Sequence, residues 1–552
     1  MTHAARGLAL ALPALLFAAP LLLALPLALI EGTQAEAWRA LLADASSLRL
    51  LASSTLLSLF TALSSTLIAL GLALWLTTHL HGTRAWQRLA NALGALLAVP
   101  HAAFAIGLAL LLMPAGLLAR MLAPLFGWAA PPDWPTVNDP RGLGLIIVLV
   151  AKETPFLLWN IAALLARPEL ALQLRGWLAE GRTLGYAPRA LWWRVLWPLL
   201  LPRLAWPLLA VLAYALTVVD LALIVGPASP PTLAVLAWQN LADGDVLRNA
   251  QGAAMALLLG AVLLLLALLL AALARASAAA WQRRVVRAVR APLADGTASR
   301  VATLAAAALV ALYGVVAGLL LASSVTGVWT FPSLLPQQWT VQAWSAVADG
   351  ADHVMLTAAL AVVAASVALL LVVAWFEAAP APWDRRVMPL VLAPLVVPGL
   401  ALMVGLYRLA LPLQLDGTLL GLAWVHLLAT LPYVFVVLAP AWRSFDRRYE
   451  LTALALGRSR LAFWWQVKWP LLRAPIASAL AVGFAVSVAQ YLATQFIGAG
   501  RFATVTTEAV TLASGGQRHT AAAFAVLQAL LPLLGFALAA RVARRAENSS
   551  IR

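Results

Sequence analysis

The sequence LGYAPRALWWRVLWPLL, residues 184–200, returns later in the chain as LGRSRLAFWWQVKWPLL, residues 456–472. Both copies contain a leading Leu-Gly pair, a Trp-Trp pair and a final Trp-Pro-Leu-Leu at the same spacing. Agreement over this length indicates a chain built from two copies of one unit. Each copy carries basic residues and is followed by an apolar segment that ends in glycine, Gly226 or Gly498. A polar loop in this position predicts a docking site between membrane helices.

The repeated stretch resembles the cytoplasmic EAA loop of permeases in binding-protein-dependent ABC importers. That loop has the pattern Glu-Ala-Ala, three residues, Gly, nine residues, Ile, one residue, Leu-Pro. Both copies keep the spacing from glycine to proline, Gly185 to Pro198 and Gly457 to Pro470. The resemblance implies that both loops bind a cytoplasmic ATPase.

The Glu-Ala-Ala triplet of that pattern is altered in both copies. Ala-Glu-Gly stands at residues 179–181, and Leu-Thr-Ala stands at residues 451–453. Glu180 therefore occupies the second triplet position, and Glu450 lies one position before the second triplet. We include both glutamates among the candidate docking residues.

Composition places the chain in a membrane. It has 552 residues, of which 63% are hydrophobic and 11% charged, with a mean hydropathy of +0.92. This leaves too little polar surface for a soluble globule of that size. The formal net charge of +16 comes mostly from arginines in short loops between apolar runs, which favours positive-inside orientation over nucleic-acid binding. The chain has no cysteine, so a disulfide framework is excluded.

Apolar runs long enough to cross about 30 Å of hydrocarbon predict an all-α integral membrane protein with about 12 transmembrane helices. The first run lacks a clean cleavage site, so we interpret it as a retained helix rather than a signal peptide. The expected spans form two sets of six, near residues 8–30, 52–78, 91–115, 142–165, 204–226 and 252–274, then 302–324, 354–376, 387–411, 417–440, 472–496 and 521–540.

Arginines cluster in alternate loops, which predicts that both termini and both repeated loops are cytoplasmic. An even number of spans in each copy then makes the halves parallel, related by a pseudo-two-fold axis along the membrane normal. We expect a first repeat at 1–274 with its loop at 167–203, a basic cytoplasmic linker at 275–300, and a second repeat at 301–552 with its loop at 441–473. Within the linker, residues 281–292 suit either an amphipathic helix on the inner leaflet or a solvated basic segment.

Prolines recur at similar places in the two sets of spans. Pro100 corresponds to Pro398, and Pro155 and Pro432 lie in the fourth spans. A proline inside a span removes a backbone hydrogen bond, so these residues are either hinges or simply tolerated.

Motifs for chemistry are absent from the sequence. There is no P-loop pattern, no H-E-x-x-H and no G-x-S-x-G, and the seven histidines do not form a spaced metal set. We expect no catalytic residues, no metal site and no cofactor on this chain. If ATP drives transport, it binds to a separate polypeptide.

Polar residues inside spans are costly unless paired or hydrated, so they mark candidate sites. The fifth spans hold the strongest set, and we expect them to line a translocation pathway rather than only to join helices: Asp220, Thr217, Gln490, Tyr491 and Gln495. Lys152 and Glu153 form either an internal charge pair or part of the pathway, and Lys152 is a potential partner of Asp220. His101, His426, Ser487 and Thr494 are further intramembrane polar residues.

The resemblance covers nearly all of the chain and is closest to fused permeases of the ferric-iron and thiamine uptake class. It implies a bacterial inner-membrane permease with two copies of a cytoplasmic ATPase, a periplasmic solute-binding protein and surrounding lipids as partners. The alternative is a secondary transporter of the major facilitator type, which also has two parallel sets of six spans. The loop at 79–91 lacks the acidic residue typical of that class. A passive channel would not need a repeated loop.

The expected cargo is a small cation. An unpaired Asp220 carboxylate within a span would have a large free-energy cost, which suggests water, a cation or a basic partner nearby. The opposing fifth span offers the neutral hydrogen-bonding groups of Gln490, Tyr491 and Gln495. This pattern suits thiamine, another small cation or ferric iron better than an oxyanion.

Overall fold

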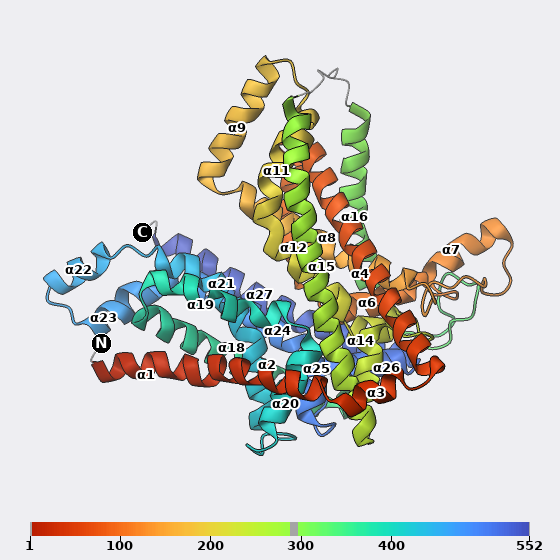
Figure 1. Ribbon diagram of the computed structural model, residues 1–552. Coiled ribbons are helices and arrows are strands. Elements are labelled where there is room, and N and C mark those ends of the chain that lie inside the picture. Colours follow the sequence, from red (N-terminus) through yellow and green to blue (C-terminus); the bar gives the residue numbers. More distant parts are fainter. Residues whose placement is uncertain (1–2, 287–295, 551–552) are drawn as a thin grey trace.

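A computed structural model describes residues 3–286 and 296–550 of the chain, and this part is helical apart from loops and one isolated bridge between Thr326 and Trp339 (Figure 1). Eleven of its helices are long and apolar enough to cross a membrane. A bent pair, α19 (Ala381–Val396) and α20 (Gly399–Ala410), brings the number to twelve. The predicted all-α membrane fold with about 12 spans is confirmed.

The first half of the chain begins with α1 (His3–Pro13) and α2 (Ala19–Gly32), joined by a π-helical turn η1 (Ala14–Ala18). Its remaining helices outside the repeated loop are α3 (Ala35–Leu42), α4 (Ala45–Leu80), α5 (Arg84–Ala98), α6 (His101–Leu112), α7 (Leu117–Phe126), α8 (Leu143–Leu165), α12 (Ala205–Thr217), α13 (Asp220–Val225), α14 (Leu233–Leu241) and α15 (Val246–Val286).

The second half begins with α16 (Gly296–Ser324). Besides α19 and α20, it contains α17 (Gln342–Asp349), α18 (Ala351–Ala378), α21 (Leu419–Arg443), α24 (Trp469–Val488), α25 (Leu492–Gly498), α26 (Val505–Ser514) and α27 (Arg518–Ser550). The first part of the expected linker continues α15 as far as Val286, and residues 287–295 lie outside the described residues.

Two expected spans are not continuous helices. The third span of each half breaks between a valine and a proline, at Val99–Pro100 and at Val397–Pro398. The valine takes an extended conformation in both, because a residue before proline is disfavoured in the α region. The second break bends the chain by 103°. By contrast, α8 and α21 run unbroken through Pro155 and Pro432.

The fifth spans are broken as well, which the sequence prediction missed. In the first half α12 ends at Thr217, and α13 starts at Asp220 after an extended Val218. In the second half α24 ends at Val488, and α25 starts at Leu492. The polar residues selected from the sequence thus lie at or near irregular backbone. Membrane proteins tolerate such backbone only where protein or water satisfies it.

The first helices of the two halves are exchanged. The α1–α2 span packs against α18 and α20 of the second half, and α16 packs against α4 and α6 of the first. Figure 1 shows α1 within the bundle of α18, α21 and α24, and α16 within the bundle of α4, α8 and α15. Glycines permit both close approaches: a Cβ on Gly405 would lie 1.9 Å from the carbonyl oxygen of Ala24, and one on Gly107 would lie 2.6 Å from Val316 Cγ1.

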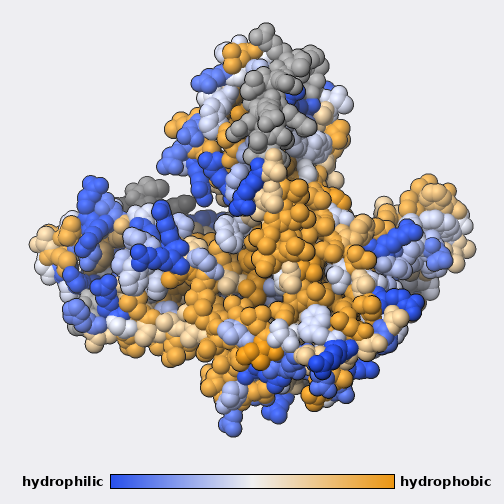
Figure 2. Space-filling view, viewed as in Figure 1, coloured by the Kyte–Doolittle hydropathy of each residue, from blue (hydrophilic) through white to orange (hydrophobic). Residues whose placement is uncertain are grey.

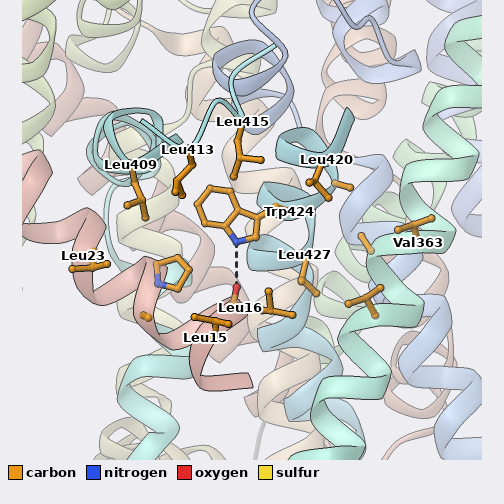
Figure 3. A pocket seen from close by; sticks show the side chains of 15 residues that line it. Leu15, Leu16, Leu23, Val363, Leu409, Leu413, Leu415, Leu420, Trp424 and Leu427 are labelled. Atoms are coloured by element: carbon orange, nitrogen blue, oxygen red, sulfur yellow. Dashed lines mark hydrogen bonds between the residues drawn. The ribbon is translucent and has the colours of Figure 1, made fainter. Parts of the chain in front are cut away.

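Contacts along the first span hold it in the second half. Arg6 Nε donates to the Ala378 carbonyl (3.0 Å), and Arg408 pairs with Glu31 (2.7 Å). Between them, Trp424 Nε1 donates to the Leu16 carbonyl (3.2 Å), beside an apolar cavity of about 570 Å³ between α2, α18 and α21 (Figure 3). Pro20 has no N–H to offer that carbonyl, so the indole supplies a donor that the helix lacks there.

The two bundles diverge toward the repeated loops. In Figure 1 they meet near α3, α14 and α26, while the loop helix α9 (Pro168–Thr183) lies at the far end of one bundle and α22 (Arg448–Ala455) at the far end of the other. The start of α1 lies beside α23 (Arg460–Phe463), on the same side of the molecule as α22. Figure 2 shows an apolar surface over the middle of the molecule, with polar side chains gathered toward its ends. This arrangement is that of a multi-pass membrane protein.

Some local structure recurs in both halves. Gly185 and Gly457 both take a positive φ in the loops described below. The first N–H of α14 and that of α26 each donate to a hydroxyl on the second span of their own half, Leu233 to Ser58 (2.8 Å) and Val505 to Thr357 (2.9 Å). The repeat stays a prediction, which these matched contacts support.

Candidate functional site

Each repeated loop reverses direction at its shared glycine. Gly185 has φ +81° and Gly457 has φ +76°, a conformation that L side chains rarely adopt. After α9, the Gly185 N–H donates to the Arg182 carbonyl and the Tyr186 N–H donates to the Gly181 carbonyl, both at 2.9 Å. These two bonds form a Schellman motif. The same pair of bonds follows α22, so the glycines are present because of their backbone conformation.

A small residue is needed at the third position of the altered triplet. A Cβ on Gly181 would lie 2.3 Å from Leu191 Cδ1, because α9 folds back onto α10 (Pro188–Leu191). The second loop has buried Ala453 at the matching position, on α22, which packs on α23 (Arg460–Phe463). Neither triplet begins with glutamate, but both keep a small residue at the third position, where the two helices of the loop touch.

The prolines Pro198 and Pro470 follow π-helical turns. In the first half the turn is η2 (Trp192–Leu196), which is followed by α11 (Trp197–Leu200) and the 3₁₀ turn η3 (Leu201–Leu204). In the second half the turn is η4 (Trp464–Lys468), which is followed by α24. In each turn the N–H of the tryptophan before the proline donates five residues back, Trp197 to Trp192 and Trp469 to Trp464. A proline cannot donate to the carbonyl four residues earlier, which favours this widened turn.

The shared tryptophans divide into inward and outward members. Trp192 and Trp197 are buried with ring centroids 5.0 Å apart, and Trp197 Nε1 donates to Thr78 Oγ1 (2.9 Å). Trp193 and Trp465 are 39% and 56% exposed. The leucines just before the turning glycines, Leu184 and Leu456, are also exposed. Exposed apolar side chains thus stand at matched positions on the two loops.

Charged residues fix the second loop to its own half. Arg443 forms a bidentate pair with Asp384 (2.7 and 2.8 Å) at the end of α21. Glu377 accepts from both Lys468 and Trp442 Nε1. These contacts join the base of the loop to α18 and α19, so a force on the loop reaches the spans.

The two loop glutamates are oriented differently. Glu180 is exposed on α9, whereas Glu450 is half-buried and lies 4.0 Å from Arg460 Nε. A partly exposed pair at that distance contributes little to stability. Both carboxylates are accessible on the loop surface.

Polar groups on the broken fifth spans have separate roles. Thr217 is buried and donates to its own helix at Ala213 (2.8 Å), and Gln490 Nε2 donates to Val486 (3.2 Å). Gln495 lines a cavity of about 270 Å³ between the two halves, together with Glu31, Asp243, Asn249, Tyr407 and Arg408. Asp220 is half-buried at the start of α13, and Tyr491 is buried at the opposite break.

His426 joins the helices around the second break. It is buried on α21, with Nδ1 2.8 Å from Ser487 Oγ and Nε2 3.1 Å from Thr494 Oγ1. These bonds connect α21 to α24 and α25, so His426, Ser487 and Thr494 hold the irregular backbone in place. These three residues therefore join helices, and pathway lining by the fifth-span set stays a prediction.

Lys152 is not the partner of Asp220 and does not form an ion pair with Glu153. It is buried, and Nζ donates to the carbonyls of Val99 (2.7 Å) and Leu96 (3.5 Å) beside the broken third span. The carbonyls at a helix end need donors, which explains why the cation points there. Glu153 lies instead 3.8 Å from His101 Nε2.

Two tyrosines beside these groups were not selected from the sequence. The ring of Tyr214 on α12 packs against the ring of His101 at a tilt of 57°, with 4.9 Å between the ring centroids. Tyr433 on α21 lies in the second half and is 38% exposed. Their hydrophobic sequence surroundings gave no sign of this role, although Tyr433 directly follows Pro432, which the repeat comparison had marked.

Comparison with known proteins gives consistent matches. Residues 378–548 match the family model described as the binding-protein-dependent transport system inner membrane component. The chain is 38% identical over 515 residues to the inner membrane ABC transporter permease protein YnjC of Escherichia coli (strain K12), covering 92% of this chain and 90% of that protein. It is 30% identical over 122 residues to the molybdenum transport system permease protein ModB of Mycobacterium tuberculosis and of Mycobacterium bovis, covering 20% of this chain and 46% of each relative. No solved structure matches the chain significantly.

Proposed function

The chain belongs to the family of inner-membrane permeases of binding-protein-dependent ABC transporters, and from this premise we propose that its two halves together form the complete membrane pathway of an importer. It is a transport component and not an enzyme, and a secondary transporter of the major facilitator type is not favoured. The proposed repeats are residues 1–274 and 301–552, with residues 275–300 between them.

The observation that carries the proposal is the doubled loop. Two helix–glycine–helix turns share a Schellman motif, a π-helical turn before proline and exposed apolar residues beside the glycine. Two equal surfaces suit two copies of one partner. We propose that each loop receives one copy of a cytoplasmic ATPase, at Glu180, Gly185 and Pro198 in the first loop and at Glu450, Gly457 and Pro470 in the second. ATP would bind only to that partner.

A periplasmic solute-binding protein would deliver the cargo to the opposite face. That face is where α3, α14 and α26 lie and where the cavity containing Gln495 is found. ATP binding would draw the two ATPase copies together, move the loops as a pair and rock the bundles about their meeting point. The equilibrium between two arrangements of the bundles would be biased by a partner at each end.

Purification with partners tests this function. The chain expressed with an ABC ATPase and a secreted binding protein encoded beside it should co-purify with two ATPase copies. In liposomes, the binding protein should stimulate ATP hydrolysis and uptake together. A chain that moves solute without any ATPase would contradict the proposal.

Topology gives an independent prediction. Reporter fusions after Arg182 and after Arg458 should both report the cytoplasm, and fusions after Asp243 and after Gly516 should both report the periplasm. A fusion after Gly82, in the turn between α4 and α5, serves as a further cytoplasmic control. Opposite sides for the two loop fusions would mean that the halves are inverted.

For the cargo, we propose a small cation such as thiamine, with ferric iron as the metal alternative. Support comes from Asp220. Its carboxylate receives no hydrogen bond from any other side chain in the described residues, and Lys152 donates to a backbone carbonyl instead of pairing with it. An oxyanion is the competing cargo, because ModB is named for molybdenum transport, although that match covers only 20% of the chain.

Replacing Asp220 with asparagine should lower uptake about tenfold and leave assembly with the ATPase unchanged. The amide keeps the size of the side chain and removes the charge that a cation would need. Uptake by reconstituted transporter and co-purification of the ATPase measure the two effects. Unchanged uptake would remove Asp220 from the pathway.

A further inference from the structure

An apolar cavity of about 570 Å³ lies where the first span packs on the second half, and we name it the first-span cavity (Figure 3). One wall is formed by η1 and α2, and the other walls are formed by α18, the start of α21 and residues 409–415. Small side chains leave the space open on three helices, with Ala19 on α2, Ala364 on α18 and Ala423 on α21. Figure 3 shows that larger aliphatic side chains surround this space, among them Leu16, Leu23, Val363, Leu415 and Leu427.

The first-span cavity lies in the part of the membrane away from the repeated loops. Helix α21 ends beside the second loop, and only its first part, between Leu420 and Leu427, lines the cavity. In the first span, Arg6 contacts the end of α18 on the loop side and Glu31 lies at the opposite end, with the lining residues 15–23 between them. The cavity therefore extends from the middle of the spans toward the end that faces away from the loops.

The rim of the cavity is open to the bilayer. Leu15 is 67% exposed and Leu420 is 71% exposed, although both lie within helices that are long and apolar enough to cross a membrane. An apolar side chain exposed on the outside of a span faces hydrocarbon. Lipid chains consequently reach the cavity without crossing any part of the protein.

The lining of the cavity offers nothing to water. Among the described residues that line it, Trp424 carries the one polar side-chain atom, and its Nε1 already donates to the Leu16 carbonyl (3.2 Å). A buried water needs two to four polar partners, so an apolar cavity of this kind stays dry. An unfilled cavity would lose dispersion contacts on every side, so the apolar material that is available at this depth enters it. Within the bilayer that material is an acyl chain.

The size of the cavity distinguishes a lipid chain from a protein partner. A helix about 10 Å across would use up this volume in roughly one turn. A hydrocarbon chain about 4 Å wide at van der Waals contact is much thinner, and it can extend along the roughly 15 Å of one leaflet. The cavity thus suits an acyl chain and not a further helix.

An arginine lies near the end of the cavity that faces away from the loops. Leu415 lines the cavity, and Gly417 is two residues further, at most about 7 Å along the chain. The side chain of Arg501 lies against this turn, because a Cβ built on Gly417 would be 3.3 Å from Arg501 Nε and 3.4 Å from Cζ. The Arg501 side chain is exposed, and its guanidinium forms no hydrogen bond or ion pair within the described residues. A guanidinium in this position can bind the phosphate of a lipid headgroup.

We propose that the first-span cavity binds one acyl chain of an anionic phospholipid, from the leaflet away from the repeated loops, with its phosphate beside Arg501. This inference goes beyond the proposed function and does not depend on the cargo. The acyl chain fills the space between α2, α18 and α21, where the first span meets the second half. The bound lipid therefore stabilises the packing of the exchanged span.

Native mass spectrometry of the purified full-length chain tests the headgroup. Delipidated protein in detergent is mixed with equal amounts of phosphatidylglycerol and phosphatidylcholine that carry identical acyl chains. Wild-type protein should retain one phosphatidylglycerol in about fivefold preference to phosphatidylcholine. Arg501→Gln should bring this ratio close to one, and the exposed Arg518→Gln should leave it unchanged. Equal retention of the two lipids by wild-type protein would overturn the proposal.

A variant that fills the cavity tests the acyl chain. Ala423→Phe places a ring in the space, so lipid retention should fall about tenfold, whereas Ala308→Phe at an exposed position on α16 should not change it. Added phosphatidylglycerol should raise the melting temperature of delipidated wild-type protein by about 5 °C and leave that of Ala423→Phe unchanged. An equal rise in wild-type protein and in Ala423→Phe would contradict the assignment.

Photolabelling locates the chain even if the filled variant does not fold. Phosphatidylglycerol with a diazirine on its acyl chain is added in equimolar amount to delipidated wild-type protein and activated by light. Peptides from residues 15–23 and 409–427 should carry most of the label, and an excess of unmodified phosphatidylglycerol should remove it. Label spread evenly over all spans, or a small membrane protein retained at these segments in place of lipid, would overturn the proposal.

Discussion

Replacing Gly185 and Gly457 together by leucine is expected to reduce ATP-driven uptake to background while the protein still inserts in the membrane. Both glycines lie at positive φ, where a leucine costs about 1–2 kcal/mol per site. Nothing lies within 4 Å of a Cβ built on Gly457, so the added side chain points into open space where the ATPase would bind. The strain is too small to unfold twelve spans, so the loss arises at the docking surface.

Asparagine at the same two positions is the matched control, because it tolerates the left-handed conformation better than leucine. The asparagine pair should retain part of the uptake, and the leucine pair none. ATPase co-purification and uptake in liposomes measure both steps. Full uptake by the leucine double variant would falsify the docking assignment.

Replacing Gly405 with leucine is expected to detach the first span from the second half. A Cβ at this position would lie 1.9 Å from the Ala24 carbonyl oxygen and 2.6 Å from its carbon, and a backbone cannot move aside as a side chain can. Overpacking of this kind costs about 3 kcal/mol or more, which predicts a fall in melting temperature of roughly 5–10 °C for purified protein. Uptake should fall with it.

Gly71→Leu provides the control, since a Cβ there has open space and the residue also lies within a long span. The chain has no cysteine, so cysteines introduced at Glu31 and Arg408, whose long side chains meet at 2.7 Å, can be joined by a short thiol-reactive bifunctional reagent that spans the lost side chains. The pair should cross-link in otherwise wild-type protein and not in the Gly405→Leu background. Equal cross-linking in both would contradict the described packing.

Local features of this protein could be predicted from its sequence. The number of spans followed from apolar length, and the loop turns followed from glycine and proline at a fixed spacing. These signals are local: Gly185 is required by its own backbone conformation, and Pro198 by the turn just before it. Neither depends on what lies across the molecule.

Features that depend on distant contacts could not be predicted. Nothing near residues 3–32 indicates that this span packs on α18 and α20, because lipid-facing and helix-facing leucines look alike in sequence. Lys152 has the same limitation: its partners are carbonyls freed by a break more than fifty residues earlier. The breaks in the fifth spans have no proline at the breaking point, so periodicity alone predicted continuous helices there.

Polar residues within spans could be found but not assigned. His426, Ser487 and Thr494 bind one another, whereas Asp220 and Glu153 bind no other side chain through a hydrogen bond. The two kinds of residue look alike in the sequence, because the sequence shows that a polar residue lies within a span but not which partner it has.

The exchanged first spans determine the order in which this protein can be made. The first helix emerges from the ribosome and enters the membrane before any of its packing partners on α18 and α20 has been synthesised. It must wait in the lipid until more than half of the chain has followed. Closing of α2 on α20 therefore waits until α20 has been synthesised, whereas α16 meets α6, which is already in the membrane. Because both halves lie on one chain, the first span and its partner helices are present in the same molecule in equal number.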